Sequence, residues 1–357
     1  MLEENRKIGS FAIAMIYVGS IIGAGFASGR EIWQYFGVFG EMGLIGLFIA
    51  GCLFVILGIM LVCIGRKLNT NDMGHVILPF ENKTAASALG YVLAVVIFVP
   101  LVTMSAAGGA FVSQQFGIHR AIGGFAIVVM VILTVLGDFE RISKVFNLLM
   151  PILVFVVAGG SLYIILFNST SSQTDYIAEP SPLAPKWYIS ALVYLAYNFI
   201  GTIPMMSKAG MQGDSIKTVI KGAALGGIIL FMMALSLNLA LTKDPEFADS
   251  LDLPMLGMVG RVSYGFNIVY SMVLFFAIYS AATSTFYGVT TKIKDGKYKN
   301  YIIIVLAMIG FLLGLAGFRQ IVAIVFPIIG IIGFLIIFMI IINFFRVYKG
   351  HGRKFEK

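Results

Sequence analysis

The chain has 357 residues and a net charge of +8. Hydrophobic residues make up 59% of it and charged residues only 12%, whereas soluble domains carry about 25% charged residues. This composition leaves no room for a large soluble domain and predicts an all-α polytopic membrane protein, because the apolar runs extend over about 20 residues each. The two cysteines and three scattered histidines form no metal or redox motif, so the sequence predicts neither an enzyme nor a resident cofactor.

We expect about ten membrane spans. Lysine and arginine gather on one side of these spans, which predicts that both termini lie in the cytoplasm of a bacterial inner membrane. The positive charge is then a topology signal beside the lipid bilayer. Because no folded domain carries a clustered basic face, nucleic-acid binding is not expected. The spans cover roughly residues 8–37, 41–65, 86–116, 121–137, 143–167, 187–211, 218–242, 257–290, 299–316 and 318–347.

The first span contains a glycine-rich stretch, GSIIGAGFASG, that runs from Gly19 to Gly29. Each glycine weakens a helix by roughly 1 kcal/mol, and unwound backbone inside a bilayer needs a partner for its peptide groups. We interpret the stretch as a broken helix that lines a substrate site. The alternative is close helix packing through small residues spaced four apart. The predicted substrate-binding residues here are Gly23, Ala24, Gly25, Phe26, Ala27, Ser28 and Gly29.

Two charged residues, Arg30 and Glu31, follow this stretch directly. Ionisable residues inside membrane spans are rare and mark functional sites by default. We predict that they form an outer gate, and that Glu31 carries the proton if transport is coupled to H⁺. The alternatives are that the two side chains pair with each other or reach the outer interface.

The third, sixth and eighth spans carry further signals. Gly201 and Pro204 predict an interruption of the sixth span, since proline removes a backbone donor. The third and eighth spans are too long for upright helices and are expected to tilt. The alternative for the polar side chains of the third and sixth spans is hydrogen bonding to neighbouring helices, and for the hydroxyls of the eighth span it is bonding back to their own helix. The residues predicted to line the site are Thr103 and Ser105 in the third span, and Tyr197, Asn198, Gly201 and Thr202 in the sixth.

The pairing of first with sixth span and third with eighth predicts an inverted repeat, because an offset of five spans reverses orientation. Residues 1–167 would form the first repeat, 168–186 an extracytoplasmic loop, 187–348 the second repeat and 349–357 a cytoplasmic tail. Residues 243–256 would form a short helical cap over the outer face. This segment is acidic and contains Asp244, Glu246, Asp249 and Asp252.

This layout resembles the LeuT-type fold of the amino acid–polyamine–cation (APC) superfamily, and GSIIGAGFASGREI resembles the YkvI-type bacterial membrane proteins. The resemblance implies a 5+5 inverted repeat with broken first and sixth helices. It also implies a possible role for Na⁺ as coupling ion, held by first-helix carbonyls and small eighth-helix residues. Carried onto this sequence, those metal ligands are Gly19, Ile22, Ala281, Ser284 and Thr285.

We therefore expect a secondary active transporter of a small-molecule substrate. The substrate would be an amino acid or a related zwitterion, coupled to Na⁺ or H⁺ by alternating access around the broken helices. The alternative is a solute sensor or receptor that keeps the transporter architecture without net transport. The first would accumulate solute in vesicles, whereas the second would bind it without accumulation.

Overall fold

The computed structural model describes residues 7–349 apart from 71–72, 81–82, 138, 168–175, 177, 291–292 and 294–295. For residues 83, 85–88, 91–92, 94–95 and 139–150 it describes the backbone alone. Most of the predicted tail 349–357 and much of the predicted loop 168–186 therefore lie outside the described residues. The described part is helical, with one isolated β-bridge between Ile8 and Gly213.

The helices follow the expected spans closely. The first half of the chain forms α1 (Ser10–Ile21), α2 (Ala24–Ala27), α3 (Arg30–Tyr35), the 3-10 turn η1 (Gly37–Phe39), α4 (Glu41–Leu68), α5 (Met73–Ile77), α6 (Lys83–Phe116), α7 (Arg120–Leu136) and α8 (Phe139–Phe167). The second half forms α9 (Trp187–Gln212), α10 (Ile216–Leu241), α11 (Pro245–Ser250), α12 (Pro254–Val262), α13 (Tyr264–Thr290), α14 (Lys299–Gly314), α15 (Phe318–Gln320), the π-helical turn η2 (Ile321–Val325) and α16 (Phe326–Tyr348).

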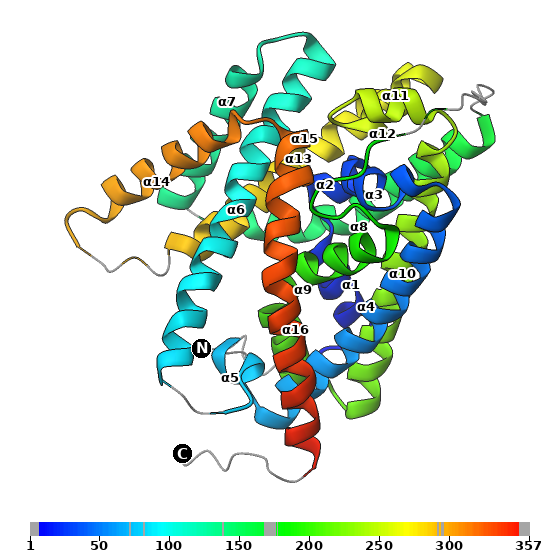
Figure 1. Cartoon of the computed structure of the whole chain (residues 1–357). Helices are drawn as coiled ribbons and strands as arrows, with labels where there is room; N and C mark the ends of the chain where they lie inside the picture. Colours follow the sequence, from blue (N-terminus) through cyan, green and yellow to red (C-terminus); the bar gives the residue numbers. More distant parts are fainter. Residues whose placement is uncertain are drawn as a thin grey trace.

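Within the described residues, six helices are long and apolar enough to cross a membrane. Four shorter apolar helices accompany them, and the two groups together follow the order of the expected spans. In Figure 1, α11, α12 and α15 lie at one end of the bundle, here called the upper end. The lower end holds α5 and the C-terminal end of α16.

Small residues hold the central helices of the bundle together. A Cβ added at Gly65 of α4 would meet the backbone of Ser207 on α9. One added at Gly210 of α9 would meet the backbone of Val62 on α4. Helices in a bilayer associate through such close backbone approach, because lipid is as apolar as leucine. The position of α9 against α4 therefore depends on glycine at these two contacts.

The first span is broken, as predicted, and it is broken twice. Helix α1 ends at Ile21, and Ile22 and Gly23 take extended conformations before α2 begins. A second break falls at Gly29, whose φ of 78° lies in the left-handed region that favours glycine. A Cβ added at Gly29 would also approach Met255 of α12 to 2.7 Å. The two breaks orient α2 and α3 independently of α1.

The sixth span is not interrupted, and this part of the prediction is wrong. Helix α9 runs unbroken from Trp187 to Gln212 with Pro204 inside it. Proline removes a single donor, the one to the Ile200 carbonyl, and α9 continues on both sides of it. The loss of one backbone bond is therefore too small a perturbation to open this helix.

The eighth span, expected as one helix over 257–290, is divided into α12 and α13 at Ser263. Ser263 is extended, and its hydroxyl accepts a hydrogen bond of 3.3 Å from the Phe266 amide. This contact is an N-cap, which starts a new helix. Asn267 ties the two pieces together by donating to the Leu256 carbonyl at 2.9 Å. The predicted cap over residues 243–256 is present as α11 and the start of α12.

Candidate functional site

The break between α1 and α2 leaves backbone acceptors without helical partners. Ile22 donates to the Val18 carbonyl at 2.9 Å, and this bond closes α1. In this described stretch, no backbone hydrogen bond runs from Gly23 to the Gly19 carbonyl or from Phe26 to the Ile22 carbonyl. Peptide oxygens that face no donor in the middle of a membrane protein are available to an ion or a ligand.

Glu31 lies beside this break as a buried carboxylate that is only 5% exposed. Its Oε2 atom accepts a hydrogen bond of 2.5 Å from the Tyr197 hydroxyl of α9, and the Asn198 amide lies next to it. A Cβ added at Gly25 would collide with the Glu31 carboxylate. The side chain is therefore folded back from α3 over α2, towards the break and α9.

Three tyrosines pack around the same place. The ring of Tyr35, which is one turn after Glu31, lies 5.6 Å from the ring of Tyr194 and 5.5 Å from that of Tyr197. The rings of Tyr194 and Tyr197 are 5.7 Å apart and perpendicular. Phe326, at the start of α16, closes the cluster at 4.7 Å from Tyr197. The carboxylate therefore sits against an aromatic wall.

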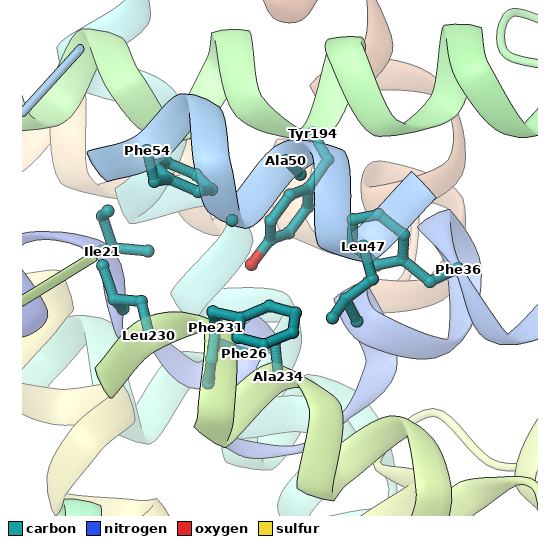
Figure 2. Close-up of a pocket in the computed structure, with 11 residues that line it drawn as sticks. Ile21, Phe26, Phe36, Leu47, Ala50, Phe54, Tyr194, Leu230, Phe231 and Ala234 are labelled. Atoms are coloured by element: carbon teal, nitrogen blue, oxygen red, sulfur yellow. The ribbon is translucent and has the colours of Figure 1, made fainter. Parts of the chain in front are cut away.

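A small apolar cavity borders the other side of this wall (Figure 2). It has room for about one water molecule. The Tyr194 hydroxyl points into it from α9, while Phe26 of α2 lies across from it. The lining residues come from α1, α2, the residue between α3 and η1, α4, α9 and α10: Ile21, Phe26, Phe36, Leu47, Ala50, Gly51, Phe54, Tyr194, Leu230, Phe231 and Ala234.

Arg30 points away from Glu31, towards the upper end of the molecule. Its side chain is fully buried, and it donates to the Gln34 side chain at 2.9 Å and to the carbonyls of Asp249 and Leu251. A guanidinium nitrogen also lies 3.4 Å from the Asp249 carboxylate of α11. Arg30 and Glu31 therefore serve two different environments and do not pair with each other.

Asp249 gathers four side chains from distant parts of the chain, and we call this group the Asp249 cluster. Besides Arg30, its carboxylate accepts from Trp33 at 2.8 Å and from Tyr176 at 2.7 Å, and it pairs with Arg319 at 2.8 Å. Partial burial acts to raise the pKa of Asp249, but these hydrogen bonds and the two arginine charges outweigh it and hold the pKa below its usual range. The cluster fastens α3 to the loop before α9, to α11 and to α15.

The exposed side of α9 changes halfway along the helix. Near its start Tyr188 and Leu192 are exposed, whereas near its end Gly201, Met205 and Lys208 are exposed. At about 100° per residue, the step from Leu192 to Gly201 turns the helix by about 900°, which places the two sets on opposite sides. The exposed residues of the upper half of α9 and those of its lower half therefore lie on opposite sides of the helix.

The predicted residues of the first span lie where the breaks place them. Gly23 is half-buried and Ala24, Gly25 and Phe26 are buried. Ala27, Ser28 and Gly29 contact α13, α12 and α10, in that order. The Ala27 carbonyl accepts from the Tyr270 hydroxyl at 2.5 Å, the Ser28 carbonyl accepts from the Met255 amide at 2.8 Å, and Gly29 packs on Leu241.

The predicted third-span residues form hydrogen bonds to α6 and α7. Thr103 is buried and donates to the Val99 carbonyl of its own helix at 3.0 Å. Ser105 faces α7, where it donates to the Gly124 carbonyl at 3.4 Å. Met104 lies between them and is the residue whose side chain approaches Gly23.

Of the predicted sixth-span residues, Tyr197 and Asn198 reach Glu31. Thr202 is buried and bonds to the Phe199 carbonyl, while Gly201 is exposed on the lower half of α9. Sequence reasoning missed Tyr35 and Tyr194, although both lie one helical turn from a predicted residue.

The predicted sodium ligands of the eighth span lie on α13. Ala281 is half-buried and Ser284 is exposed. The Thr285 hydroxyl donates back to the Ala281 carbonyl at 2.7 Å. The predicted first-helix ligands, Gly19 and Ile22, are the residues whose carbonyls lack helical partners at the break. Whether these groups share an ion stays a prediction.

A bundle of apolar helices around a twice-broken first span defines a protein with the LeuT-type transporter fold, and solved structures of this fold match the chain. Mhp1 in an inward-facing conformation is 14% identical over 94% of this chain and 76% of its own, with a TM-score of 0.62. MhsT in complex with L-phenylalanine is 15% identical over 97% and 99%, with a TM-score of 0.61. A Na⁺-coupled sialic acid symporter is 13% identical over 95% and 79%, with a TM-score of 0.57.

The chain is a homologue of the uncharacterized membrane protein YkvI of Bacillus subtilis. It is 24% identical to it over 333 residues, which cover 92% of this chain and 94% of YkvI. The protein YyaD of the same organism is 24% identical over 89% of this chain and 92% of its own length. No protein-family model matches the chain. The fold is the one that these transporter structures share.

Proposed function

We propose that the chain is a secondary active transporter that moves a small solute across a bacterial inner membrane, with both termini in the cytoplasm. The solute is an amino acid or a related zwitterion, and its movement is coupled to Na⁺ or H⁺. The observation that carries this proposal is the break in the first span, where open carbonyls lie beside the buried Glu31 carboxylate. Interrupted helices at mid-membrane are where transporters hold substrates and ions.

The contrast between the two ends of the molecule supports alternating access. At the upper end the Asp249 cluster joins α3 to α11 and α15, so that end is closed. In the lower half, α9 exposes a second side at Gly201 and Met205, which is expected where a bundle opens inwards. We propose that this is the inward-open state, and that transport requires the Asp249 cluster to open.

Reconstitution of the purified chain in lipid vesicles tests this proposal. Uptake of a radiolabelled amino acid mixture is measured under an imposed Na⁺ gradient, under a pH gradient, and with choline and no gradient. Accumulation driven by either gradient is the expected result. Binding to the purified protein without accumulation under any gradient would contradict transport and favour a sensor.

Na⁺ as the coupling ion has a separate test in Ser284 and Thr285. If the two hydroxyls bind the ion, the double substitution Ser284→Ala and Thr285→Ala raises the Na⁺ concentration needed for half-maximal uptake. An unchanged Na⁺ requirement would exclude them as ligands. Uptake driven by a pH gradient alone would instead make Glu31 the coupling residue, since it is the buried carboxylate next to the break.

A further inference from the structure

The surroundings of Glu31 lack a positive charge. Among the residues that the structure describes, no lysine, arginine or histidine nitrogen lies within 4.0 Å of its carboxylate. The neighbouring Arg30 is engaged with Asp249 and Gln34. A buried carboxylate without a positively charged partner is unfavourable in its charged form, and either a proton or a bound cation would neutralise it.

The groups around Glu31 favour an organic cation. Tyr197 donates to one carboxylate oxygen at 2.5 Å, and Asn198 lies beside the group. Tyr35, Tyr194 and Tyr197 form three mutually contacting rings, which Phe326 extends. Aromatic faces next to a carboxylate are the surroundings that attract an ammonium group, through its charge and through cation–π contact.

A multivalent metal ion fits this place poorly. Hard divalent cations take six or so oxygen ligands, several of them carboxylates. Among the described residues, no three His, Cys, Asp or Glu side chains come together to hold a metal ion. Glu31 offers a single negative charge beside aromatic rings, which matches a monovalent ligand.

We infer that Glu31 and the tyrosines Tyr35, Tyr194 and Tyr197 form the subsite that binds the ammonium group of the transported solute. This inference rests on the function proposed above and specifies its substrate class: the solute carries an amine. A free amine and the α-amino group of an amino acid present the same chemistry, and the probes below separate them.

Thermal unfolding of the purified full-length chain provides the test. The probes are tetramethylammonium, methylammonium and glycine, compared with NaCl and KCl at equal ionic strength and with glycolate, which replaces the ammonium group of glycine by a hydroxyl. A ligand that binds only the folded state raises the melting temperature with its concentration. We expect a rise with the ammonium compounds that exceeds the rise with NaCl or KCl, since a coupling ion would stabilise the folded state by itself, and no such excess with glycolate.

An excess with glycine alone assigns the site to amino acids, and an excess with the simple ammonium ions as well extends it to free amines. No excess with any ammonium compound, or an equal rise with glycine and glycolate, would overturn the inference.

Glu31→Gln tests the carboxylate directly, because it preserves shape and removes charge. We expect it to weaken ammonium binding roughly tenfold or more, as for loss of a charged hydrogen bond. The matched control is Glu41→Gln, at an exposed carboxylate that starts α4; it should leave binding unchanged. Equal binding by Glu31→Gln and the unsubstituted chain would contradict the assignment.

Carbodiimide labelling of the unsubstituted chain keeps the inference testable even if Glu31→Gln folds poorly. Dicyclohexylcarbodiimide modifies carboxyl groups in apolar surroundings, and mass spectrometry locates the adduct. Tetramethylammonium, which has no nucleophilic nitrogen, should protect Glu31 and leave the labelling of Glu41 unchanged. Labelling of Glu31 that is unaffected by tetramethylammonium would overturn the inference.

Failure of this inference and failure of transport are distinguishable. If vesicles accumulate a solute without an amine and Glu31→Gln transports it normally, the ammonium subsite is wrong and the transporter stands. If ammonium compounds bind through Glu31 and no gradient drives accumulation, the subsite stands and transport is wrong.

Discussion

Arg30 and Glu31 are adjacent in sequence, yet their side chains enter two regions of different electrostatics. One region pairs the buried charge with an opposite charge, and the other surrounds it with neutral groups. Arg30 enters the Asp249 cluster, where a carboxylate, a second arginine and two aromatic donors satisfy one another. Glu31 enters the break, where its described partners are a tyrosine hydroxyl and an amide. Both side chains are buried, so the two regions differ in whether an opposite charge pairs with the buried one, and not in the degree of burial.

From this difference we expect the Asp249 cluster to keep the upper end closed and the surroundings of Glu31 to bind the ligand. A cluster that joins four segments through paired charges and hydrogen bonds stabilises one conformation of the molecule. A buried carboxylate that is not paired with a positive charge contributes little to the stability of the fold. Its charge is available to a bound cation. The comparison predicts that substitutions in the Asp249 cluster change the conformational equilibrium, and that substitutions around Glu31 change binding.

The largest effect is expected for Asp249→Ala, which leaves Arg30 buried without its negative partner. Removing one member of a buried pair costs about 3–5 kcal/mol, and we expect about 3 because Arg319 is 40% exposed. The melting temperature, measured by thermal unfolding of the purified protein, should fall accordingly.

The control for this substitution is Asp252→Ala. Asp252 pairs at 3.0 Å with Arg120, whose side chain is 57% exposed, and such pairs contribute at most about 1 kcal/mol. Equal losses in the two variants would show that the Asp249 cluster is no tighter than a surface ion pair.

The next effect is expected for Gly25→Ala, which acts on Glu31 from the opposite side. The added Cβ would occupy the space of the Glu31 carboxylate, and overpacking of this kind costs roughly 1–3 kcal/mol. Ammonium binding and uptake should be lost while the Asp249 cluster stays closed. Gly159→Ala on α8 is the control, since its Cβ would meet nothing within 4 Å. If Gly25→Ala transports as well as Gly159→Ala, Glu31 does not occupy the site described.

The sequence predicted the part of the site that depends on local backbone chemistry. Gly23 and Gly29 take conformations that interrupt a helix, and glycine content alone indicated this. The same reasoning failed at Pro204, because the loss of one donor does not open a helix whose neighbouring turns remain bonded. A signal at Ser263 was available and overlooked: a serine ahead of a new helix is a typical N-cap.

The partners across the fold could not be predicted in the same way. Arg30 and Asp249 are separated by 219 residues, and nothing local to either indicates the other. Asp249 was expected in a cap over the outer face, but its role as the centre of a cluster depends on how α3, α11 and α15 meet. Tyr35 and Tyr194 were within reach, since residues three or four apart share a helix face.

The smallest effect is expected for Tyr176→Phe, which removes one hydrogen bond from Asp249 and sharpens the comparison through pH. A depressed pKa stabilises the folded state above the unfolded pKa of about 3.9 and loses this contribution as pH falls through the folded value. Without the Tyr176 hydroxyl, the pKa of folded Asp249 moves up towards its usual range. The contribution of Asp249 should then be smaller, and its loss on acidification, which begins near the unfolded pKa in both proteins, should be complete at a higher pH; at pH 7 the change stays within about 1 kcal/mol. Melting curves at successive pH values measure this, with Tyr264→Phe, at a 79% exposed tyrosine, as control. Superimposable pH profiles for the two variants would mean that Tyr176 contributes nothing to the charge state of the cluster, and that the arginines and Trp33 alone compensate Asp249.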